Sequence, residues 1–247
     1  TRYESSAASD VYKRQSNDIG LDRGQLGSER LVKFIKRGNK LLLIQPNLYY
    51  RAETENLSEK KSVDQAFAKS VLFGFEIIDK YEDSYKIDFT SFLKYDRHGV
   101  AKTLKNKNQG SYSVDLSKSS IEMFNTKAFP RNVEFEALLT FSGDAKGNLV
   151  RSVVPDPNNI TVTQHHSFIQ LPNNDYQPRK FDPRSGAIFI EFMDYSTPVD
   201  QEMVKKYIIR HRLKKKNPSL PVSEPVEPII YYLDPGTPEP VKSALIN

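Results

Sequence analysis

The side chains with the greatest chemical potential lie between Gln164 and Gly186, a stretch that holds two adjacent histidines and a run rich in Pro, Asp and Arg. His165 and His166 fall on a predicted strand, where neighbouring side chains point to opposite faces. They cannot both ligate one metal ion unless a bulge interrupts the strand. We therefore expect one histidine to be buried and hydrogen-bonded and the other to be exposed.

The remaining histidines do not indicate a metal centre either. The four, at positions 98, 165, 166 and 211, lack the i and i+4 spacing around a glutamate that a helical zinc pair needs. No serine stands in a Gly-x-Ser-x-Gly elbow. The sequence therefore assigns no catalytic residue and no metal ligand to this chain, and His98 is expected to face solvent or to cap a helix.

The second half of the stretch is typical of an ordered turn. Asp182 and Arg184 flank Pro183, which predicts that they pair with each other or cap the turn before Gly186. The alternative to this structural role is a binding surface for a glycan or a peptide. Such a surface would use six side chains: His165, His166, Tyr176, Arg179, Asp182 and Arg184.

Composition limits the classes of partner. The 247 residues are 38% hydrophobic and contain no cysteine, and no apolar run approaches the roughly 20 residues that span a bilayer. The net charge of +5 is local, because seven Lys or Arg fall between Lys205 and Lys216 without an acid. A nucleic-acid-binding face would spread its cations more widely. We therefore expect neither a nucleic-acid partner nor a transmembrane segment, and interpret the basic run as a solvated helix end.

The scaffold around the candidate side chains is predicted to be strands joined by short turns. Two apolar runs, 30–36 and 41–45, flank a Gly-Asn turn and predict a hairpin. Short connections favour antiparallel pairing. Residues 133–141 predict a half-buried strand, whose apolar face comprises Val133, Phe135, Ala137, Leu139 and Phe141.

Helices are expected at the periphery. One is predicted from Ser58 to about residue 73, another from Thr90 as its cap with an interruption at His98-Gly99, and a third from Asp200. Residues 107–115 are predicted as a polar loop, 149–154 as a strand, and 187–195 as a strand buried on both faces. The expected fold class is α+β, a β-rich and mostly antiparallel sheet with a few peripheral helices.

Four segments are expected along the chain. Residues 1–15 resemble the translated adapter sequence that recurs at the ends of metagenomic assemblies, so we interpret them as non-native. Residues 16–217 are predicted to form one domain and 218–228 a Pro-rich linker. Residues 229–247 predict the first strand, 229–233, and the first helix, 239–246, of a further domain.

Nine segments spread over residues 16–247 carry a family resemblance. They are Asp22–Arg30, Lys107–Tyr112, Thr126–Asn132, Gln164–Phe168, Tyr176–Arg179, Phe181–Gly186, Met193–Tyr195, Arg210–Leu213 and Val222–Leu233. Together they resemble the region ahead of the catalytic domain in large bacterial zinc-dependent metallopeptidases of the metzincin type. In that family this region is a domain of unknown function.

The resemblance implies an N-terminal accessory domain at residues 16–217 and the truncated start of a metzincin-like catalytic domain at 229–247. It places the zinc-binding His-Glu-x-x-His helix downstream of Asn247, so no cofactor is expected in this chain and zinc is expected in the full-length protein. The expected partners are the protein's own downstream catalytic domain and a protein or peptide substrate. The expected setting is periplasmic, cell-surface or extracellular.

Two functions are compatible with these observations. The first is the non-catalytic accessory region of a secreted zinc metallopeptidase. The second is a stand-alone β-rich module that binds a glycan or a peptide. The residues alone do not choose between them, because one fold can carry many functions.

Overall fold

The computed structural model describes residues 4–12, 19–21, 24–172 and 175–246. The chain divides into two compact units, residues 1–173 and 174–247. Strands hold 39% of the chain and helices 16%. The expected β-rich, mostly antiparallel class with few helices is confirmed. Within the described ranges, no helix combines the length and apolarity needed to cross a membrane.

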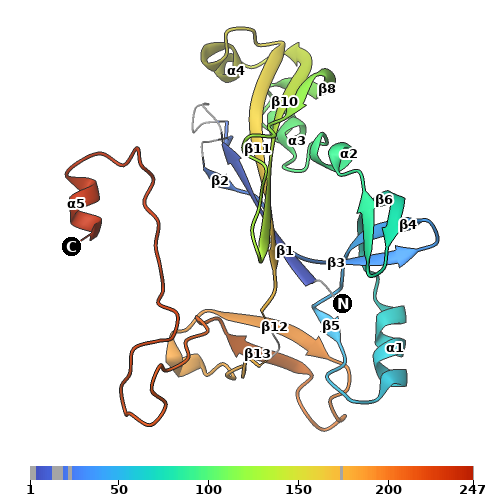
Figure 1. The fold of residues 1–247 in the computed structure, drawn as a ribbon, viewed down its shortest axis with the longest axis vertical. Helices are drawn as coiled ribbons and strands as arrows, with labels where there is room; N and C mark the ends of the chain where they lie inside the picture. The colour runs from blue at the N-terminus through green and yellow to red at the C-terminus, as the bar shows by residue number, and fades with distance from the viewer. Residues whose placement is uncertain (1–3, 13–18, 22–23, 173–174, 247) are drawn as a thin grey trace. The chain divides into compact units, whose positions relative to one another are not determined.

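The first unit is built on one antiparallel sheet of ten strands (Figure 1). Eight of them follow the order β7-β6-β4-β3-β1-β11-β10-β8, while β2 pairs with β1 and β9 with β10. The bounds are β1 Glu4–Tyr12, β2 Gln25–Leu26, β3 Arg30–Arg37, β4 Lys40–Gln45, β6 Ser70–Tyr81, β7 Ser84–Ile87, β8 Gly110–Ile121, β9 Lys127–Ala128, β10 Asn132–Ala145 and β11 Asn159–Gln170.

The strand β1 lies in the middle of this order, between β3 and β11, although it falls within the residues interpreted as non-native. Ser5 is opposite Gln170 of β11, and Glu4 is opposite Lys33 of β3. The rest of that segment, residues 1–3 and 13–15, lies outside the described ranges. The origin of residues 1–15 stays a prediction.

The predicted hairpin at residues 30–45 is confirmed as β3 and β4. Gly38 has a φ of +59°, a left-handed conformation that glycine adopts at little cost, and Arg37 pairs with Lys40 across the turn. Val32 and Leu43 are each 1% exposed. The hairpin thereby contributes one apolar side chain from each strand to the core.

The core lies on the face of the sheet covered by α2 (Thr90–Leu93) and α3 (Val100–Asn106). The alternation predicted for residues 133–141 is confirmed, because Ala137, Leu139 and Phe141 of β10 are fully buried. Each large apolar side chain buried in this way contributes about 1.5 to 3 kcal/mol. The break predicted at His98-Gly99 does separate α2 from α3. Thr90 was expected to cap α2, but Asp88 accepts the first backbone N–H of the helix instead, because its Oδ1 lies 2.8 Å from the Thr90 backbone nitrogen.

The helix predicted to run to residue 73 is wrong in its length. α1 covers Leu57–Ala66, and its N-cap is Asn56, whose Oδ1 accepts from the Ser58 N–H at 3.0 Å. β6 begins at Ser70 and pairs with β4. Pairing with an apolar strand outweighs the helical spacing of the apolar residues after Ala66. The short β5 (Tyr50–Arg51) packs against the C-terminal end of α1, because the Tyr50 ring stacks on the ring of Phe67 with their centres 4.1 Å apart.

Two further predictions for the first unit are wrong. Residues 107–115 were expected to be a loop but contain the start of β8, and 149–154 were expected to be a strand but form α4 (Asn148–Val153). Gln109 explains both, because its Oε1 accepts from the Val150 N–H at 3.1 Å and its carbonyl from the Lys146 N–H at 2.9 Å. Local sequence patterns cannot predict this contact, because Gln109 and Val150 are 41 residues apart in the sequence.

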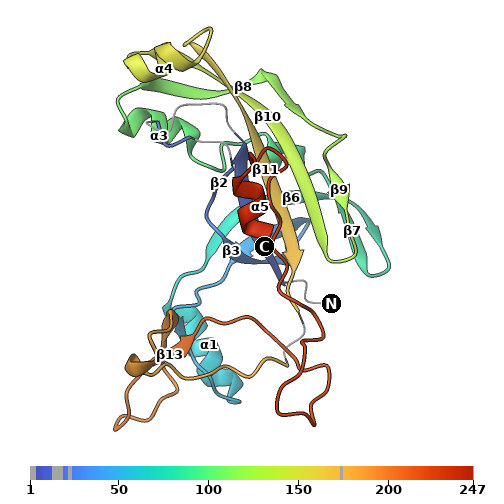
Figure 2. The same ribbon diagram turned by 90° about the vertical axis from the view of Figure 1, so that its left-hand side faces the viewer.

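The sheet is bent, so that segments near both ends of its strand order border the same pocket. Residues of the β6–β7 turn and of the segment between β9 and β10 line the same pocket. Figure 2 shows β7 and β9 close together although β7 is at one end of the strand order and β9 pairs with β10 near the other. The core helices α2 and α3 leave this part of the concave face uncovered.

The second unit contains a hairpin of β12 (Phe189–Asp194) and β13 (Val204–Ile208), with the 3₁₀ turn η1 (Pro183–Ser185) before it. The helix predicted from Asp200 is therefore wrong, and so is its interpretation as the source of a basic helix end. Residues 204–208 instead pair with β12 as the strand β13, and all five are half-buried. The strand expected to be buried on both faces exposes 52% of Ile190.

The C-terminal segments of this unit agree with the sequence only in part. The helix expected at 239–246 is present as α5 (Val241–Ile246), but residues 229–233 do not form a strand. Their side chains are exposed, with Tyr231 at 82% and Tyr232 at 90%. An extended apolar run forms a strand only where another strand supplies its hydrogen bonds.

Candidate functional site

His165 and His166 point to opposite faces of β11, as predicted. His166 is only 4% exposed and lies in the core, with its ring 5.8 Å from that of Phe92. The expectation that the other histidine is exposed needs correction. The His165 side chain is 21% exposed and its Nε2 lies 2.8 Å from Oε2 of Glu134.

Glu134 is the centre of a polar cluster on the outer face of β10 and β11. Ser167 Oγ donates to its Oε1 at 2.7 Å, and Asn132 Nδ2 donates to the same atom at 2.5 Å. Burial raises the pKa of Glu134, but the hydrogen bonds from Asn132, Ser167 and His165 outweigh it and hold the pKa below its ordinary value. Glu134 is therefore an anion that three neighbours stabilise.

This cluster does not have the geometry of a nucleophile and its base. In a hydrolytic triad the hydroxyl is hydrogen-bonded to the imidazole. Here Ser167 and His165 both bond to the carboxylate of Glu134 instead. A second carboxylate, Glu136, lies 4.0 Å from His165 Nδ1. The arrangement braces β10 against β11, and the Ser167 hydroxyl bonds to the Glu134 carboxylate rather than to an imidazole.

His166 shares its surroundings with a third histidine that the sequence had placed in solvent. The rings of His98 and His166 are 5.5 Å apart, and both line a cavity of about 270 Å³ with Arg97. Burial, and then the charges of His98, His165 and Arg97, lower the pKa of His166 to about 3. His166 is thus neutral at physiological pH. His98, which was expected to face solvent or to cap a helix, is half-buried, and its contact with His166 joins it to a distant part of the fold.

Gln164 is the most unusual buried residue of β11. Its side chain is 0% exposed, and neither its Oε1 nor its Nε2 has a hydrogen-bond partner in the described part of the chain. An unsatisfied buried amide costs about 1 to 3 kcal/mol. Sequence reasoning had no signal for it, because a glutamine in a strand is usually exposed.

Tyr176 and Arg179 lie in the second unit along the outer side of β13. The Arg210 guanidinium is 4.9 Å from the centre of the Tyr176 ring, and the Arg179 carbonyl accepts from the Ile208 N–H at 3.0 Å. Tyr176 is thus held by a cation–π contact and Arg179 by its backbone.

Asp182 and Arg184 pair across η1, as predicted. Asp182 Oδ1 accepts from the Arg184 backbone N–H at 2.9 Å, and its Oδ2 from Arg184 Nη2 at 2.6 Å. The hydrogen bonds from the side chain and the backbone of Arg184 lower the pKa of Asp182. The Arg184 side chain is 90% exposed, so this ion pair orders the turn more than it stabilises the fold.

The six predicted binding residues are divided between the two units. His165 and His166 belong to the first unit, and Tyr176, Arg179, Asp182 and Arg184 belong to the second. Within the first unit, His165 and His166 point to different faces of a sheet. Within the second unit, Asp182 and Arg184 are in direct contact. Their role in binding stays a prediction.

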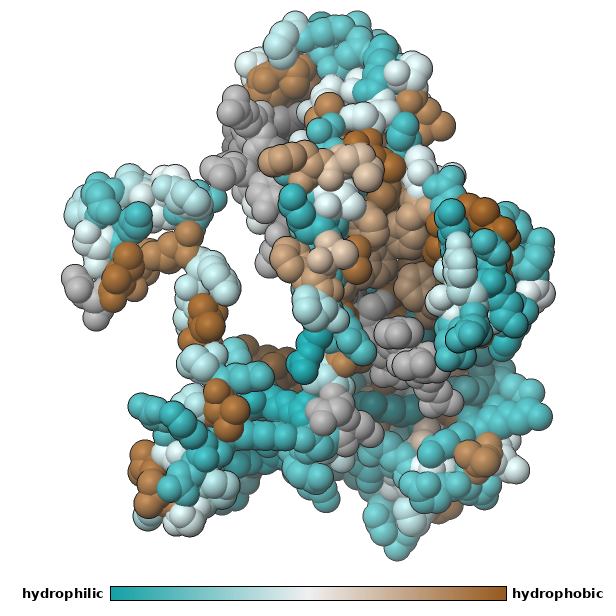
Figure 3. All heavy atoms as spheres, in the orientation of Figure 1, coloured by the Kyte–Doolittle hydropathy of each residue, from teal (hydrophilic) through white to brown (hydrophobic). Residues whose placement is uncertain are grey.

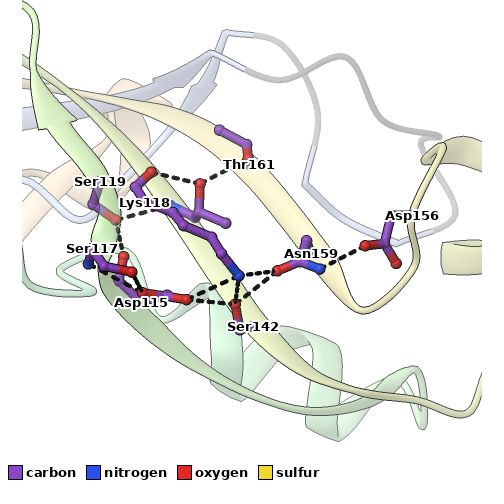
Figure 4. A network of polar contacts seen from close by, with 9 residues as sticks. Asp115, Ser117, Lys118, Ser119, Ser142, Asp156, Asn159 and Thr161 are labelled. Carbon is purple, nitrogen blue, oxygen red and sulfur yellow. Dashed lines mark hydrogen bonds and ion pairs between the residues drawn. The ribbon is translucent and has the colours of Figure 1, made fainter.

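A polar network that the sequence did not reveal covers the outer face where β8, β10 and β11 meet (Figure 4). Lys118 Nζ lies 3.1 Å from Asp115 Oδ2 and donates to Asn159 Oδ1 at 2.8 Å. Ser142 Oγ donates to the same Asp115 oxygen at 3.0 Å. Hydrogen bonds from Ser117, Lys118 and Ser142 lower the pKa of Asp115. Lys118 is a donor to acceptors here, so it does not act as a base toward Ser142.

This network holds a bulge in β8. Asp115 is opposite Thr140 and Ser120 is opposite Leu138, so the four residues 116–119 of β8 face a single residue of β10. Ser119 Oγ accepts from the Thr140 N–H at 3.1 Å and donates to the Asp115 carbonyl at 2.7 Å. The bulge side chains therefore replace the missing ladder hydrogen bonds.

An apolar pocket opens on the concave face of the bent sheet, and we call it the aromatic hollow. Its volume is about 560 Å³. Figure 3 shows apolar side chains gathered in a recess between the regions labelled β10 and β6 in Figure 1. Its aromatic lining comprises Phe34, Tyr85, Phe89, Phe129, Phe135 and Phe168. Pockets of this size and lining are typical of sites for small apolar ligands.

The zinc implied by the family resemblance has no matching ligand set in this chain. Among the described residues, no three His, Cys, Asp or Glu side chains come together in a way that could hold a metal ion. The nearest approach, His165 with Glu134 and Glu136, is already used for hydrogen bonding. No chemical step is assigned to a metal here.

The fold and these sites define a β-rich, antiparallel domain with a concave aromatic pocket. The family model described as "Domain of unknown function (DUF5117)" matches residues 24–216, and the chain belongs to this family. The comparison with curated proteins finds no match, and the comparison with solved structures finds none either.

Proposed function

We propose that the chain is the N-terminal accessory region of a secreted bacterial zinc-dependent metallopeptidase, non-catalytic itself, and that a downstream domain hydrolyses the peptide bonds. Membership of the DUF5117 family is consistent with this proposal. The motif resemblance over residues 16–247 supplies the expected peptidase context, with zinc bound downstream. The same resemblance implies a periplasmic, cell-surface or extracellular setting.

The observation that carries the proposal is the apolar run at residues 229–233. Ile230, Tyr231 and Tyr232 are 62%, 82% and 90% exposed, and they are consecutive. Val241, Leu245 and Ile246 of α5 add three exposed apolar side chains nearby in sequence. Contiguous exposed apolar surface of this kind marks an interaction site. A catalytic domain that pairs with residues 229–233 and packs on α5 would cover it.

The test is the gene product that continues past Asn247. We expect a His-Glu-x-x-His sequence there, about one zinc ion per chain, and hydrolysis of an unfolded protein such as casein. Replacement of the glutamate in that motif by glutamine is the matched control and should abolish hydrolysis while zinc remains bound. A longer product without the motif, or without zinc, would contradict the proposal.

A stand-alone β-rich module that binds a glycan or a peptide is the second candidate. The second unit favours it, because the Arg210 guanidinium holds the aromatic ring of Tyr176 in place, 4.9 Å from its centre. Binding of the purified chain to a glycan or peptide array, lost on changing Tyr176→Ala and Arg179→Ala, would place the site on the second unit. Binding that survives those changes would direct attention to the first unit.

A further inference from the structure

The aromatic hollow has a preformed and rigid floor. The Phe89 ring stacks on Phe75 at 4.7 Å and on Phe135 at 5.1 Å, and it meets Phe168 edge-on at 5.4 Å. Phe75 is 1% exposed and belongs to the core. Because the floor is anchored in the core, the hollow cannot close by a simple change of side-chain rotamer. An apolar ligand would therefore meet a surface that is already shaped.

The hollow has polar lining residues beside its aromatic ones, and cations outnumber acids among the charged ones. Lys36 of β3 and Arg131, which follows β9, line the hollow together with one acid, Asp83 of the β6–β7 turn. Among the described residues, neither the Lys36 ammonium nor the Arg131 guanidinium is within ion-pair distance of a carboxylate. Both cations are exposed and available to a ligand.

The lining argues against a buried peptide backbone. Each peptide unit that enters an apolar pocket must find partners for its N–H and its C=O, or lose several kcal/mol of hydration. The phenylalanine side chains of the floor, Phe89, Phe135 and Phe168, offer no such partners, whereas Ser84, Asn132 and Gln170 add polar groups elsewhere in the lining. A hydrocarbon chain has no polar groups to satisfy and avoids this cost.

We propose that the aromatic hollow binds a free single-chain carboxylate of medium length, with its alkyl chain among the phenylalanines and its carboxylate between Lys36 and Arg131. The inference goes beyond the proposed function and needs neither zinc nor a downstream domain. Volume, apolar lining and the two unpaired cations together select an apolar molecule with one negative charge.

The test uses the purified 247-residue chain and a fluorescent probe, 11-(dansylamino)undecanoate. Decanoate should displace the probe, and decanol and decylammonium should do so at least about tenfold more weakly, because they cannot pair with two cations. Shortening decanoate to octanoate removes two methylene groups and should weaken displacement by roughly tenfold. All competitors are used below their micelle-forming concentrations.

Variants locate the site. Arg131→Gln and Lys36→Gln should weaken decanoate and leave decanol unchanged, while Phe129→Ala, a change at a side chain that is 53% exposed, should weaken both. Lys86→Gln, an exposed cation of β7 outside the lining, is the control and should change neither. These residues are exposed, so folding should be retained, and thermal melts check that it is.

Three results would overturn the inference. One is equal displacement by decylammonium and decanoate, and another is displacement that no lining variant alters. The third is displacement by an apolar peptide with a free C-terminal carboxylate but not by decanoate. Failure of this test would leave the peptidase proposal untouched, because that proposal is judged on the longer gene product.

Discussion

His165 Nε2 lies 2.8 Å from Glu134 Oε2, so the outer face of β10 and β11 is joined by a histidine and a carboxylate that are 31 residues apart in the sequence. Ser167 and Asn132 donate to the other oxygen of the same carboxylate. Glu134→Ala should remove both acceptor oxygens, and with them three hydrogen bonds, and lower the free energy of unfolding by about 1 to 3 kcal/mol. Urea unfolding measures this, with Glu82→Ala in the exposed β6–β7 turn as the control.

The same carboxylate should contribute to acid sensitivity. The folded-state pKa of Glu134 lies below its ordinary value of 4.5, so its stabilising effect is present above pH 4.5 and is lost as the pH falls through the folded-state pKa. Glu134→Gln should therefore lose less stability than the unchanged protein between pH 5 and pH 3. Parallel urea titrations at each pH compare the two, and identical curves would show that Glu134 is not the group involved.

His166 should dominate the pH dependence of folding stability in a second pH range. Its pKa is lowered from 6.5 to about 3, so between these values the unfolded chain binds a proton that the folded chain does not. Stability should therefore fall as pH falls below 6.5, by at most about 1.4 kcal/mol per pH unit for this group. His166→Phe should flatten the slope between pH 6 and pH 5, where Glu134 does not contribute. His211→Gln, at an exposed position, should leave it unchanged.

Gln164 offers a substitution that should raise stability. Its buried amide has no partner among the described residues, so Gln164→Met should remove an unsatisfied polar group and keep much of the volume. We expect an unchanged or higher melting temperature. Gln170→Met, at an exposed position of the same strand, is the control. A clear loss of stability at position 164 would instead indicate that the amide holds an ordered water molecule.

Two glycines of the sheet should respond differently to alanine. A Cβ at Gly143 would lie 2.1 Å from the Ser111 carbonyl oxygen, which belongs to the backbone of the paired strand β8. A Cβ at Gly74 would lie 3.2 Å from Leu42 Cδ2, a side-chain atom that can move. Gly143→Ala should therefore cost roughly 1 to 3 kcal/mol and Gly74→Ala less. Urea unfolding measures both losses of stability. Equal losses would mean that the backbone of β8 moves away from the new Cβ as easily as the Leu42 side chain does.

Local patterns were sufficient where the partner of a residue is close in sequence. The Gly-Asn turn predicts the β3–β4 hairpin, the period of two predicts the core face of β10, and Asp-Pro-Arg predicts the turn at η1. The opposite orientation of His165 and His166 also follows from strand geometry alone.

The features that the sequence did not predict depend on contacts between residues that are far apart in the chain. Val204–Ile208 fits a helical face as well as a strand, and only pairing with β12 distinguishes them. His98 lies beside His166 because the α2–α3 connection packs on β11. The aromatic hollow draws on β3, β7 and β10, whose residues no sequence pattern connects.

The bulge at residues 116–119 also changes how the edge of β8 could pair with a strand of another molecule. β8 ends the strand order, and an edge strand with regular free N–H and C=O groups can pair with the edge of another molecule. The three extra residues of the bulge break that regularity near the middle of β8, and the half-exposed Lys118 adds a charge at the same point. A second molecule would find no continuous template along this edge, so the twelve-residue strand stays compatible with a dispersed protein.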